Sequence, residues 1–371
     1  MIYLDHNATT PIAPEAARAM SPYLFGEFGN PSSEYELGRR AKAALEAARA
    51  QVAGLIGAEP GEVVFTSGGT ESNNAILKGI FYSRSRPVHI VTSRTEHPAI
   101  INPCLFLMAQ GAQVTFLRVD GQGLIDPDEV GRAIRPETAL VSIMLANNET
   151  GVLQPIEEIG RITKARGVPL HTDAAQAVGK IPIDVRKLGV DALSVAGHKI
   201  YAPKGVGALF LRGGLEIEPF MHGAGQEAGR RAGTENVVLA VGLGAAAELA
   251  AGRVDRDGPL LQEMRDRLEA ALMARLPDLV RVGHPDRRLP NTLNVCLPGR
   301  AGADILARAP EIQASTGAAC HAGQVKVSPV LQEMGLASEV AMGAIRLTLG
   351  RLNSPDQIET AAELLAGAAG A

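Results

Sequence analysis

Between residues 60 and 212, short runs of β-branched and apolar residues alternate with longer stretches of helical pattern. Helix start signals stand between most of the runs, as in IDPDEVGRAI, where Asp126 precedes Pro127 at the first helical position. Apolar strands that alternate with helices form largely parallel sheets covered on both faces. We therefore predict an α/β protein with a mixed, mostly parallel sheet built from VVFTS, HIVTS, QVTFLRV, LVSIML, VPLHTDA, ALSVAG and GALFLR.

Near residues 252–259, which read GRVDRDGP, the composition turns polar and the alternation ends. A long amphipathic stretch follows, and then come the strand candidates LVRVG, TLNVCLP, EIQASTG and AIRLTLG. A chain of 371 residues also exceeds what one ordinary hydrophobic core holds. We expect a large domain over 15–255, a small α+β domain over 256–371, and a segment over 1–14 that bridges to the small domain.

Composition narrows the possible functions. The formal net charge is −4 and aromatic residues make up 4% of the chain, without tryptophan, so we expect no nucleic-acid partner. No stretch approaches the roughly 18 apolar residues of a membrane helix, and Asp5 stands where a signal peptide would need an apolar run. The three cysteines form no CxxC pair, which fits a reducing compartment. We expect a cytoplasmic protein without a metal site.

Ligands of open parallel sheets bind beyond the carboxyl ends of the strands, so polar residues just after strands are candidate site residues. The first group lies in VVFTSGGTESNN, where Gly68 and Gly69 let backbone N–H groups approach an anion at the start of a helix. Thr70 adds a hydroxyl. Neither GxxxxGK[ST] nor GxGxxG occurs in the chain. The turn predicts a phosphate cradle of another kind, although glycine turns also occur without ligands.

Two charged residues follow later strands. Asp173 ends the strand in VPLHTDAAQ, where a carboxylate needs a partner; a helix N-cap is the structural alternative. Lys199 follows ALSVAG, where it could bind an anion or form a covalent bond to an aldehyde; a solvated loop lysine is the alternative. A phosphate cradle, a carboxylate and a lysine at three strand ends match pyridoxal 5′-phosphate, which uses all three.

The chain resembles the cysteine desulfurase and selenocysteine lyase family of the class V aminotransferase group, and the resemblance runs nearly end to end. The matching stretches occur in order: YLDHNATTP, FGNPSS, FTSGGTESNN, TEHPA, NNETG, HTDAAQ, GHKIYAPKGVGAL, GQEAGRRAGTEN and IRLTLGR. The resemblance implies the aspartate-aminotransferase-like fold (fold type I) and pyridoxal phosphate as the cofactor. It also implies a homodimer.

The resemblance implies a role for each matched residue. Lys199 would bond the cofactor covalently and Asp173 would pair with its ring nitrogen. His97 would stack on the ring and move protons. Arg346, in AIRLTLGR, would bind the substrate α-carboxylate in the bidentate geometry of a guanidinium. Cys320, in ASTGAACHAG, would be the nucleophile that accepts sulfur, with His321 beside it to favour the thiolate.

Further residues would complete the binding site. Asn148 and Gln176 would hydrogen-bond the ring hydroxyl, and Asn7 would contact the substrate. The phosphate would be bound by Gly69, Thr70 and His198, together with Thr234 from the other subunit of the dimer.

Several positions depart from the commonest desulfurase pattern. Ala196 stands where many members have serine, which removes one phosphate hydroxyl, and Tyr35 replaces a histidine after NPSS. The cysteine loop reads TGAACHAGQVKVSPVL rather than SGSACTS, and with LANNETG and HTDAAQ it looks more like selenocysteine lyases. The other two cysteines, Cys104 and Cys296, lie in apolar patterns and are expected to be structural.

These observations predict an enzyme that converts L-cysteine to L-alanine and transfers the sulfur to Cys320 as a persulfide for delivery to an acceptor. Two alternatives remain at this point. A selenocysteine lyase would release selenium from L-selenocysteine, with Cys320 setting specificity or donating a proton. Another pyridoxal-phosphate C–S lyase or class V transferase would leave Cys320 without a catalytic role. A non-enzymatic sulfur-relay scaffold is disfavoured by the complete set of Asp173, Lys199, His97 and Arg346.

Overall fold

The computed structural model describes residues 1–85, 87–316, 320–321, 324–325 and 327–370, the two short pairs by their backbone alone. Its largest sheet has seven strands in the order β2-β8-β7-β6-β5-β3-β4. Strand β8 runs antiparallel to both neighbours, and all other pairs are parallel. The fold prediction is confirmed, and each predicted run contains one strand: β2 Val63–Thr66, β3 His89–Ser93, β4 Gln113–Leu117, β5 Thr138–Ser142, β6 Leu170–Asp173, β7 Ala192–Ala196 and β8 Gly207–Leu211.

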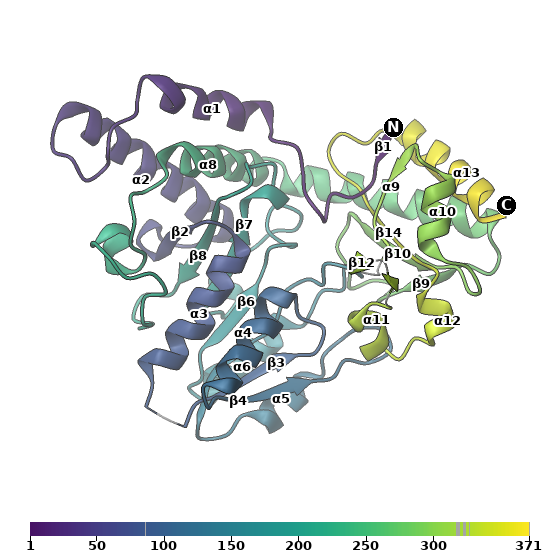
Figure 1. Cartoon of the computed structure of the whole chain (residues 1–371), viewed down its shortest axis with the longest axis horizontal. Helices are drawn as coiled ribbons and strands as arrows, with labels where there is room; N and C mark the ends of the chain where they lie inside the picture. The colour runs from purple at the N-terminus through teal and green to yellow at the C-terminus, as the bar shows by residue number, and fades with distance from the viewer. Residues whose placement is uncertain (86, 317–319, 322–323, 326, 371) are drawn as a thin grey trace.

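Helices cover both faces of this sheet (Figure 1). Successive strand residues point to opposite faces, so Val63 and Phe65 belong to one core cluster and Val64 to another. The first cluster packs under α1, α2, α5, α6, α7 and α8, and the second under α3 and α4. These helices span Pro14–Phe25 (α1), Glu36–Ile56 (α2), Gly69–Ser83 (α3), Pro98–Ala109 (α4), Pro127–Ala133 (α5), Ile156–Ala165 (α6), Val185–Leu188 (α7) and Val237–Ala251 (α8).

A second region is built on the antiparallel sheet β14-β10-β9, with helices α9 and α13 packed together beside it (Figure 1). Its core cluster includes Ile2 and Leu4 from the N-terminus, because β1 pairs in parallel with β11. The division into 1–14, 15–255 and 256–371 stays a prediction. The elements here are β1 Ile2–Tyr3, α9 Val254–Arg275, β9 Val280–Val282, β10 Thr292–Cys296, α10 Gly302–Arg308, β11 Ile312–Gln313, β12 Cys320–His321, β13 Gln324–Val325, α11 Pro329–Glu333, α12 Ser338–Ala341, β14 Ala344–Thr348 and α13 Pro355–Gly370.

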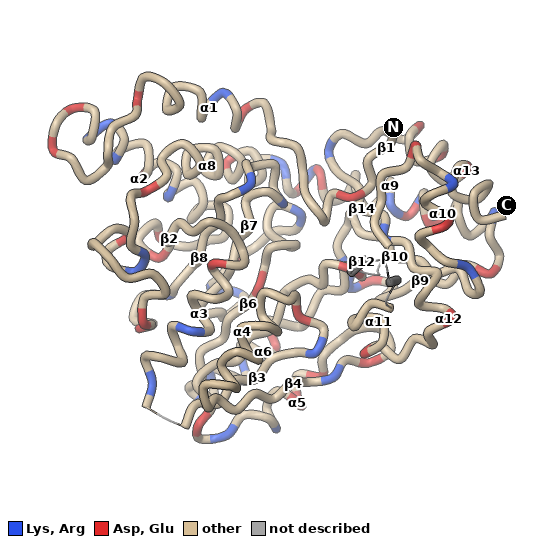
Figure 2. The backbone as a smooth tube through the Cα atoms, in the orientation of Figure 1, with Lys and Arg blue, Asp and Glu red and all other residues tan. Residues whose placement is uncertain are grey.

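Cys104 and Cys296 are buried and free, as expected for structural cysteines. Burial raises the pKa of each thiol to about 12, so thiolate is scarce near neutral pH. Acidic and basic residues are interspersed along the backbone, in keeping with the small net charge (Figure 2). Among the described residues no single helix is long and apolar enough to cross a membrane; α8 and α9 pass that test only as a pair bent by 73°.

Candidate active site

A cavity of about 340 Å³ opens where β6, β7 and the start of α3 meet the N-terminal segment and β14. Of the predicted site residues whose side chains the structure describes, all except Gly68 and Thr234 lie in its wall. The wall is formed by Asn7, Ala8, Gly69, Thr70, Asn73, His97, Ala99, Met144, Ala146, Asn148, Asp173, Ala175, Gln176, Ala196, His198, Lys199 and Arg346. The carboxyl ends of parallel strands therefore gather the predicted residues, as expected for an open α/β sheet.

Lys199 ends the 3₁₀ turn Gly197–Lys199 (η2) that follows β7. Its Nζ donates to the backbone oxygens of Asn7, at 2.5 Å, and Ala8, at 2.7 Å. Burial and the nearby charge of Arg346 together lower the pKa of Lys199 to about 8, against the opposing effect of Asp5 and Asp173. A free amine is therefore available close to neutral pH, and the solvated-loop alternative is wrong.

Asp173, the last residue of β6, is 6% exposed. Its Oδ2 accepts a hydrogen bond from Asn73 Nδ2 at 2.6 Å, and its Oδ1 accepts from the Ala175 N–H at 2.9 Å. No helix begins after it, so the N-cap alternative is also wrong. Within the described residues no lysine, arginine or histidine forms an ion pair with Asp173, so this buried carboxylate has hydrogen-bond donors but no ion-pair partner.

Asn73 was not predicted from the sequence. It lies one helical turn after Gly69 on α3, so the i, i+4 spacing placed it on the cradle's face. The side chain is 1% exposed, and its Oδ1 is buried without a hydrogen-bond partner in the described structure. A buried acceptor of this kind is expected to meet a donor from a ligand or a water.

His97 is the N-cap of α4, where its Nδ1 accepts a hydrogen bond from the Ala99 N–H at 3.1 Å. An accepting Nδ1 carries no proton, so the neutral ring must hold its proton on Nε2. His97 lines the cavity. Burial lowers the pKa of its ring because it disfavours the charged form, and the charge of Lys199 lowers it as well, against the opposing effect of Asp173. His97 therefore presents a neutral ring with one N–H donor.

The proposed phosphate cradle begins at Gly68, whose φ of +146° favours glycine, and Gly69, the first residue of α3. The first N–H groups of a helix have no partner within it, so they are available to an anion. Thr70 is exposed at the cavity edge. Burial, aided by the charges of Lys199, Lys204 and Lys180, lowers the pKa of His198 to about 4, so this ring is neutral near neutral pH.

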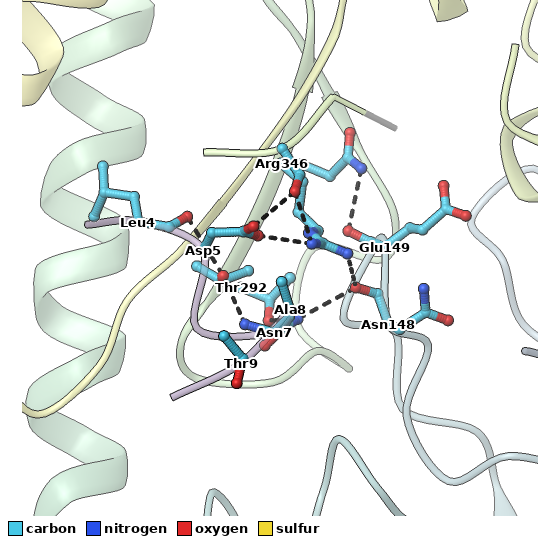
Figure 3. A network of polar contacts seen from close by, with 12 residues as sticks. Leu4, Asp5, Asn7, Ala8, Thr9, Asn148, Glu149, Thr292 and Arg346 are labelled. Carbon is cyan, nitrogen blue, oxygen red and sulfur yellow. Dashed lines mark hydrogen bonds and ion pairs between the residues drawn. The ribbon is translucent and has the colours of Figure 1, made fainter. Parts of the chain in front are cut away.

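Arg346 on β14 is held by three different segments (Figure 3). Its Nη2 donates to Asp5 Oδ1 at 2.7 Å and to Ser315 Oγ at 3.1 Å. Its Nη1 donates to the Asn148 backbone oxygen at 3.0 Å, and Ser315 Oγ donates to Asp5 Oδ2 at 2.8 Å. The Nε donor is buried without a partner among the described residues. Asp5 and Ser315 are therefore parts of the site that the sequence did not predict.

Three predicted residues remain to be accounted for. Thr234 is exposed and does not line the cavity of its own chain. Cys320 and His321 are described by their backbone, which pairs with Val325 and Gln324. The side chains of Cys320 and His321 lie outside the described structure, so their roles stay predictions.

The wall fits pyridoxal phosphate. It contains a lysine of lowered pKa, a buried carboxylate that forms no ion pair among the described residues, and the start of a helix at a glycine turn. These groups match the cofactor's aldehyde, ring nitrogen and phosphate, respectively. Among the described residues no group of three or more His, Cys, Asp or Glu side chains could hold a metal ion.

Comparison with known proteins agrees with this geometry. The model of the family described as aminotransferase class-V matches residues 2–360. Cysteine desulfurase IscS of Methanosarcina thermophila is 46% identical, over 98% of this chain and 91% of that protein. Human cysteine desulfurase is 44% identical over 98% of this chain and 80% of its own.

Solved structures show the same fold. A NifS-like protein superposes with a TM-score of 0.93 at 34% identity, covering 99% of this chain and 98% of its own. A structure described as SspA in complex with cysteine gives a TM-score of 0.84 at 36% identity, over 94% of this chain and 99% of its own.

Proposed function

The chain belongs to the class-V aminotransferase family, and from that premise we propose that it is a pyridoxal-phosphate-dependent cysteine desulfurase. One observation carries the proposal: Lys199, Asp173 and Arg346 meet in one cavity of a chain 46% identical to a protein named cysteine desulfurase IscS. The substrate is L-cysteine and the products are L-alanine and sulfur bound to the protein. Selenocysteine lyase is not favoured, because both relatives compared above by sequence are named cysteine desulfurases.

The cofactor would be held by residues from several strand ends, and His97 would cover its ring. The holding residues would be Lys199, Asp173, Gln176, Asn148, His198 and the Gly69–Thr70 turn. When bound, pyridoxal phosphate supplies an electron sink for negative charge that develops at the substrate α-carbon. Asp173 favours this chemistry, because a buried carboxylate stabilises a proton on the ring nitrogen. Asn73 holds that carboxylate in place.

The chain's own residues bind the substrate and move its protons. Arg346 binds the α-carboxylate, and its guanidinium is already oriented by Asp5. Lys199 Nζ, whose pKa is about 8, takes the proton from the α-carbon and returns it. The Nε2–H of His97 is a second proton donor at the cavity wall.

Cys320 completes the reaction. Its thiolate attacks the sulfur of the substrate, so that an S–S bond forms while the bond between the substrate sulfur and Cβ breaks. The electron pair of the broken bond stays with the three-carbon product, which takes up protons and leaves as alanine. Cys320 is left as a persulfide, and atoms balance because cysteine differs from alanine by one sulfur. An acceptor protein would then remove this sulfur.

We place the working enzyme in the cytoplasm as a homodimer, in which Thr234 of each subunit reaches the phosphate site of the other. The exposure of Thr234 outside its own cavity supports this arrangement.

The proposal is tested by alanine formation from cysteine and from selenocysteine, using the wild-type protein and Cys320→Ala. We expect Cys320→Ala to lose at least about 100-fold in turnover with cysteine, because the covalent acceptor is absent. Selenocysteine turnover should fall much less, since selenium leaves carbon more readily. Unchanged cysteine turnover in Cys320→Ala would contradict the persulfide route, and a wild-type protein active only on selenocysteine would favour the lyase.

A further inference from the structure

Lys180 is a buried lysine that the mechanism above does not use. It is 8% exposed, and within the described residues it forms no ion pair with a carboxylate. Its Nζ donates to Asn7 Oδ1 and to Gln176 Oε1, at 2.8 Å in each case. Burial lowers the pKa of Lys180 well below its ordinary value, and the charges of Lys199 and Arg346 lower it further. Burial of the Lys180 amino group lowers the stability of the folded protein. A role for Lys180 in the neighbouring site would explain why it is buried there.

The amino group of a lysine dictates which end of an amide it meets. In its charged form a lysine Nζ only donates hydrogen bonds, and Lys180 donates in both of its contacts, to Asn7 and to Gln176. Both contacted amides, Asn7 and Gln176, therefore turn their oxygens toward Lys180 and their NH₂ groups away from it. The second contact of Gln176 requires the same orientation, because its Nε2 donates to the Asn7 backbone oxygen, which can only accept.

The orientation of the amide matters most for Gln176, because this residue is 6% exposed and lines the cavity. One hydrogen of its Nε2 is used by the Asn7 backbone oxygen, at 3.0 Å. The second hydrogen has no partner among the described residues. In Asn7 both hydrogens of Nδ2 are used, by the Asn148 backbone oxygen and by Thr292 Oγ1. Gln176 is thus the amide with a donor left over at the cavity wall.

The same network reaches the reactive lysine. The Asn7 backbone oxygen accepts from Gln176 Nε2 and also from Lys199 Nζ. The side chain of Gln176 therefore links Lys180 to the Asn7 backbone oxygen, which also accepts from Lys199. Lys180 itself does not line the cavity.

We propose that Lys180 is a positioning residue that fixes the Gln176 amide with its N–H toward the cavity, so that this wall accepts an anionic ring oxygen of the cofactor and disfavours a neutral ring hydroxyl. The proposal rests on the proposed function, in which Gln176 faces that ring oxygen. An ionised ring oxygen is an acceptor and pairs with an N–H, whereas a neutral hydroxyl must find an acceptor of its own. Without Lys180 the Gln176 oxygen loses the donor that faces it, and only the bond to the Asn7 backbone oxygen opposes a turn of the amide that would bring its oxygen inward.

The test replaces Lys180 with methionine, which keeps the length of the side chain and removes every donor. Pyridoxal phosphate is titrated into the cofactor-free protein, and both the Kd and the absorption spectrum of the bound cofactor are recorded. We expect the Kd to rise roughly tenfold, the effect of one lost hydrogen bond, and the absorption to shift toward the form with a neutral ring hydroxyl. Lys187→Met, on the exposed surface of α7, is the matched control and should change neither quantity.

A double-mutant comparison separates positioning from a general loss of stability. If Lys180 acts through the amide, Lys180→Met should change neither Kd nor spectrum further in a Gln176→Leu background. An unchanged Kd and spectrum in Lys180→Met, or an equal loss in both backgrounds, would overturn the proposal. Lys180→Gln keeps a donor and replaces Lys180→Met in this comparison if the methionine variant does not fold. These readouts need no turnover, so a wild-type protein that makes no alanine would refute the proposed reaction and leave this test intact.

Discussion

Asp5 and Arg346 form an ion pair of 2.7 Å although 341 residues separate them in sequence. Asp5 does not line the cavity, whereas Arg346 does. The Asp5 carboxylate therefore contacts the Nη2 group of Arg346 from outside the cavity wall (Figure 3). Ser315 joins the same pair through its hydroxyl and lies at the beginning of the segment that leads to Cys320.

We predict that Asp5→Asn raises the KM for cysteine roughly tenfold and changes kcat by less than about threefold. The amide keeps the shape of Asp5 but loses the charge, and a hydrogen bond to a charged group contributes roughly 1.5–3 kcal/mol. Steady-state alanine formation measures both constants. Ser315→Ala, which removes a neutral partner, should have a smaller effect. A lower KM in Asp5→Asn would mean that Asp5 competes with the substrate for Arg346, which is contrary to the positioning role.

The sequence predicted the charged residues of the site better than their partners. Asp173 and Lys199 stand at strand ends, where the rule for parallel sheets directs attention to them. Asn73 carried a usable signal, since it lies four residues after Gly69 on a helix. The pairing of Asp5 with Arg346 carried none, because it depends on how β1 and β14 meet in space.

At the scale of elements, β-branched runs predicted every strand of the large sheet but not the reversed direction of β8. Strand direction depends on the connection, and only ten residues or so separate β7 from β8 in the chain, too few for a helical crossover. The hydrophobic periodicity of the sequence also does not predict the close packing of α10 on β14. Gly302 begins α10, and a Cβ added there would lie 2.2 Å from the Ala344 backbone oxygen in the strand that carries Arg346.

We predict that Gly302→Ala destabilises the protein by roughly 1–3 kcal/mol, because backbone must move to relieve the overlap. Gly54→Ala, in α2, is the matched control: a Cβ there meets nothing within 4 Å, so stability should rise by up to about 1 kcal/mol. Denaturant unfolding of the two variants measures both changes. Equal stabilities would show that the contact between α10 and β14 relaxes without cost.

At the scale of the whole molecule, the cavity lies between the seven-stranded sheet and the region of β14. In the proposed function, the sheet side would bind the cofactor and the β14 side the substrate. The resemblance to cysteine desulfurases implies that a second subunit contributes Thr234 to this site. Neither hydrophobic pattern nor residue spacing predicts such a contribution, because the contact exists only in an assembly.

The dimer prediction is tested by mixing two inactive variants, Lys199→Ala and Thr234→Val, under conditions that exchange subunits. In a mixed dimer, one site receives Lys199 and Thr234 in their natural forms from different chains. Random exchange of equal amounts should therefore restore about a quarter of the wild-type sites. Activity that stays at the level of the separate variants would place Thr234 outside the partner's site.

The central claim is that Lys199, in this cavity, binds pyridoxal phosphate and carries out cysteine desulfuration. The most direct measurement follows alanine formation from cysteine together with the visible absorption band of the bound cofactor in wild-type protein and Lys199→Ala. The wild-type protein should show both, and Lys199→Ala should lose both while circular dichroism confirms an intact fold. A Lys199→Ala protein that retains the band and the turnover would contradict the account.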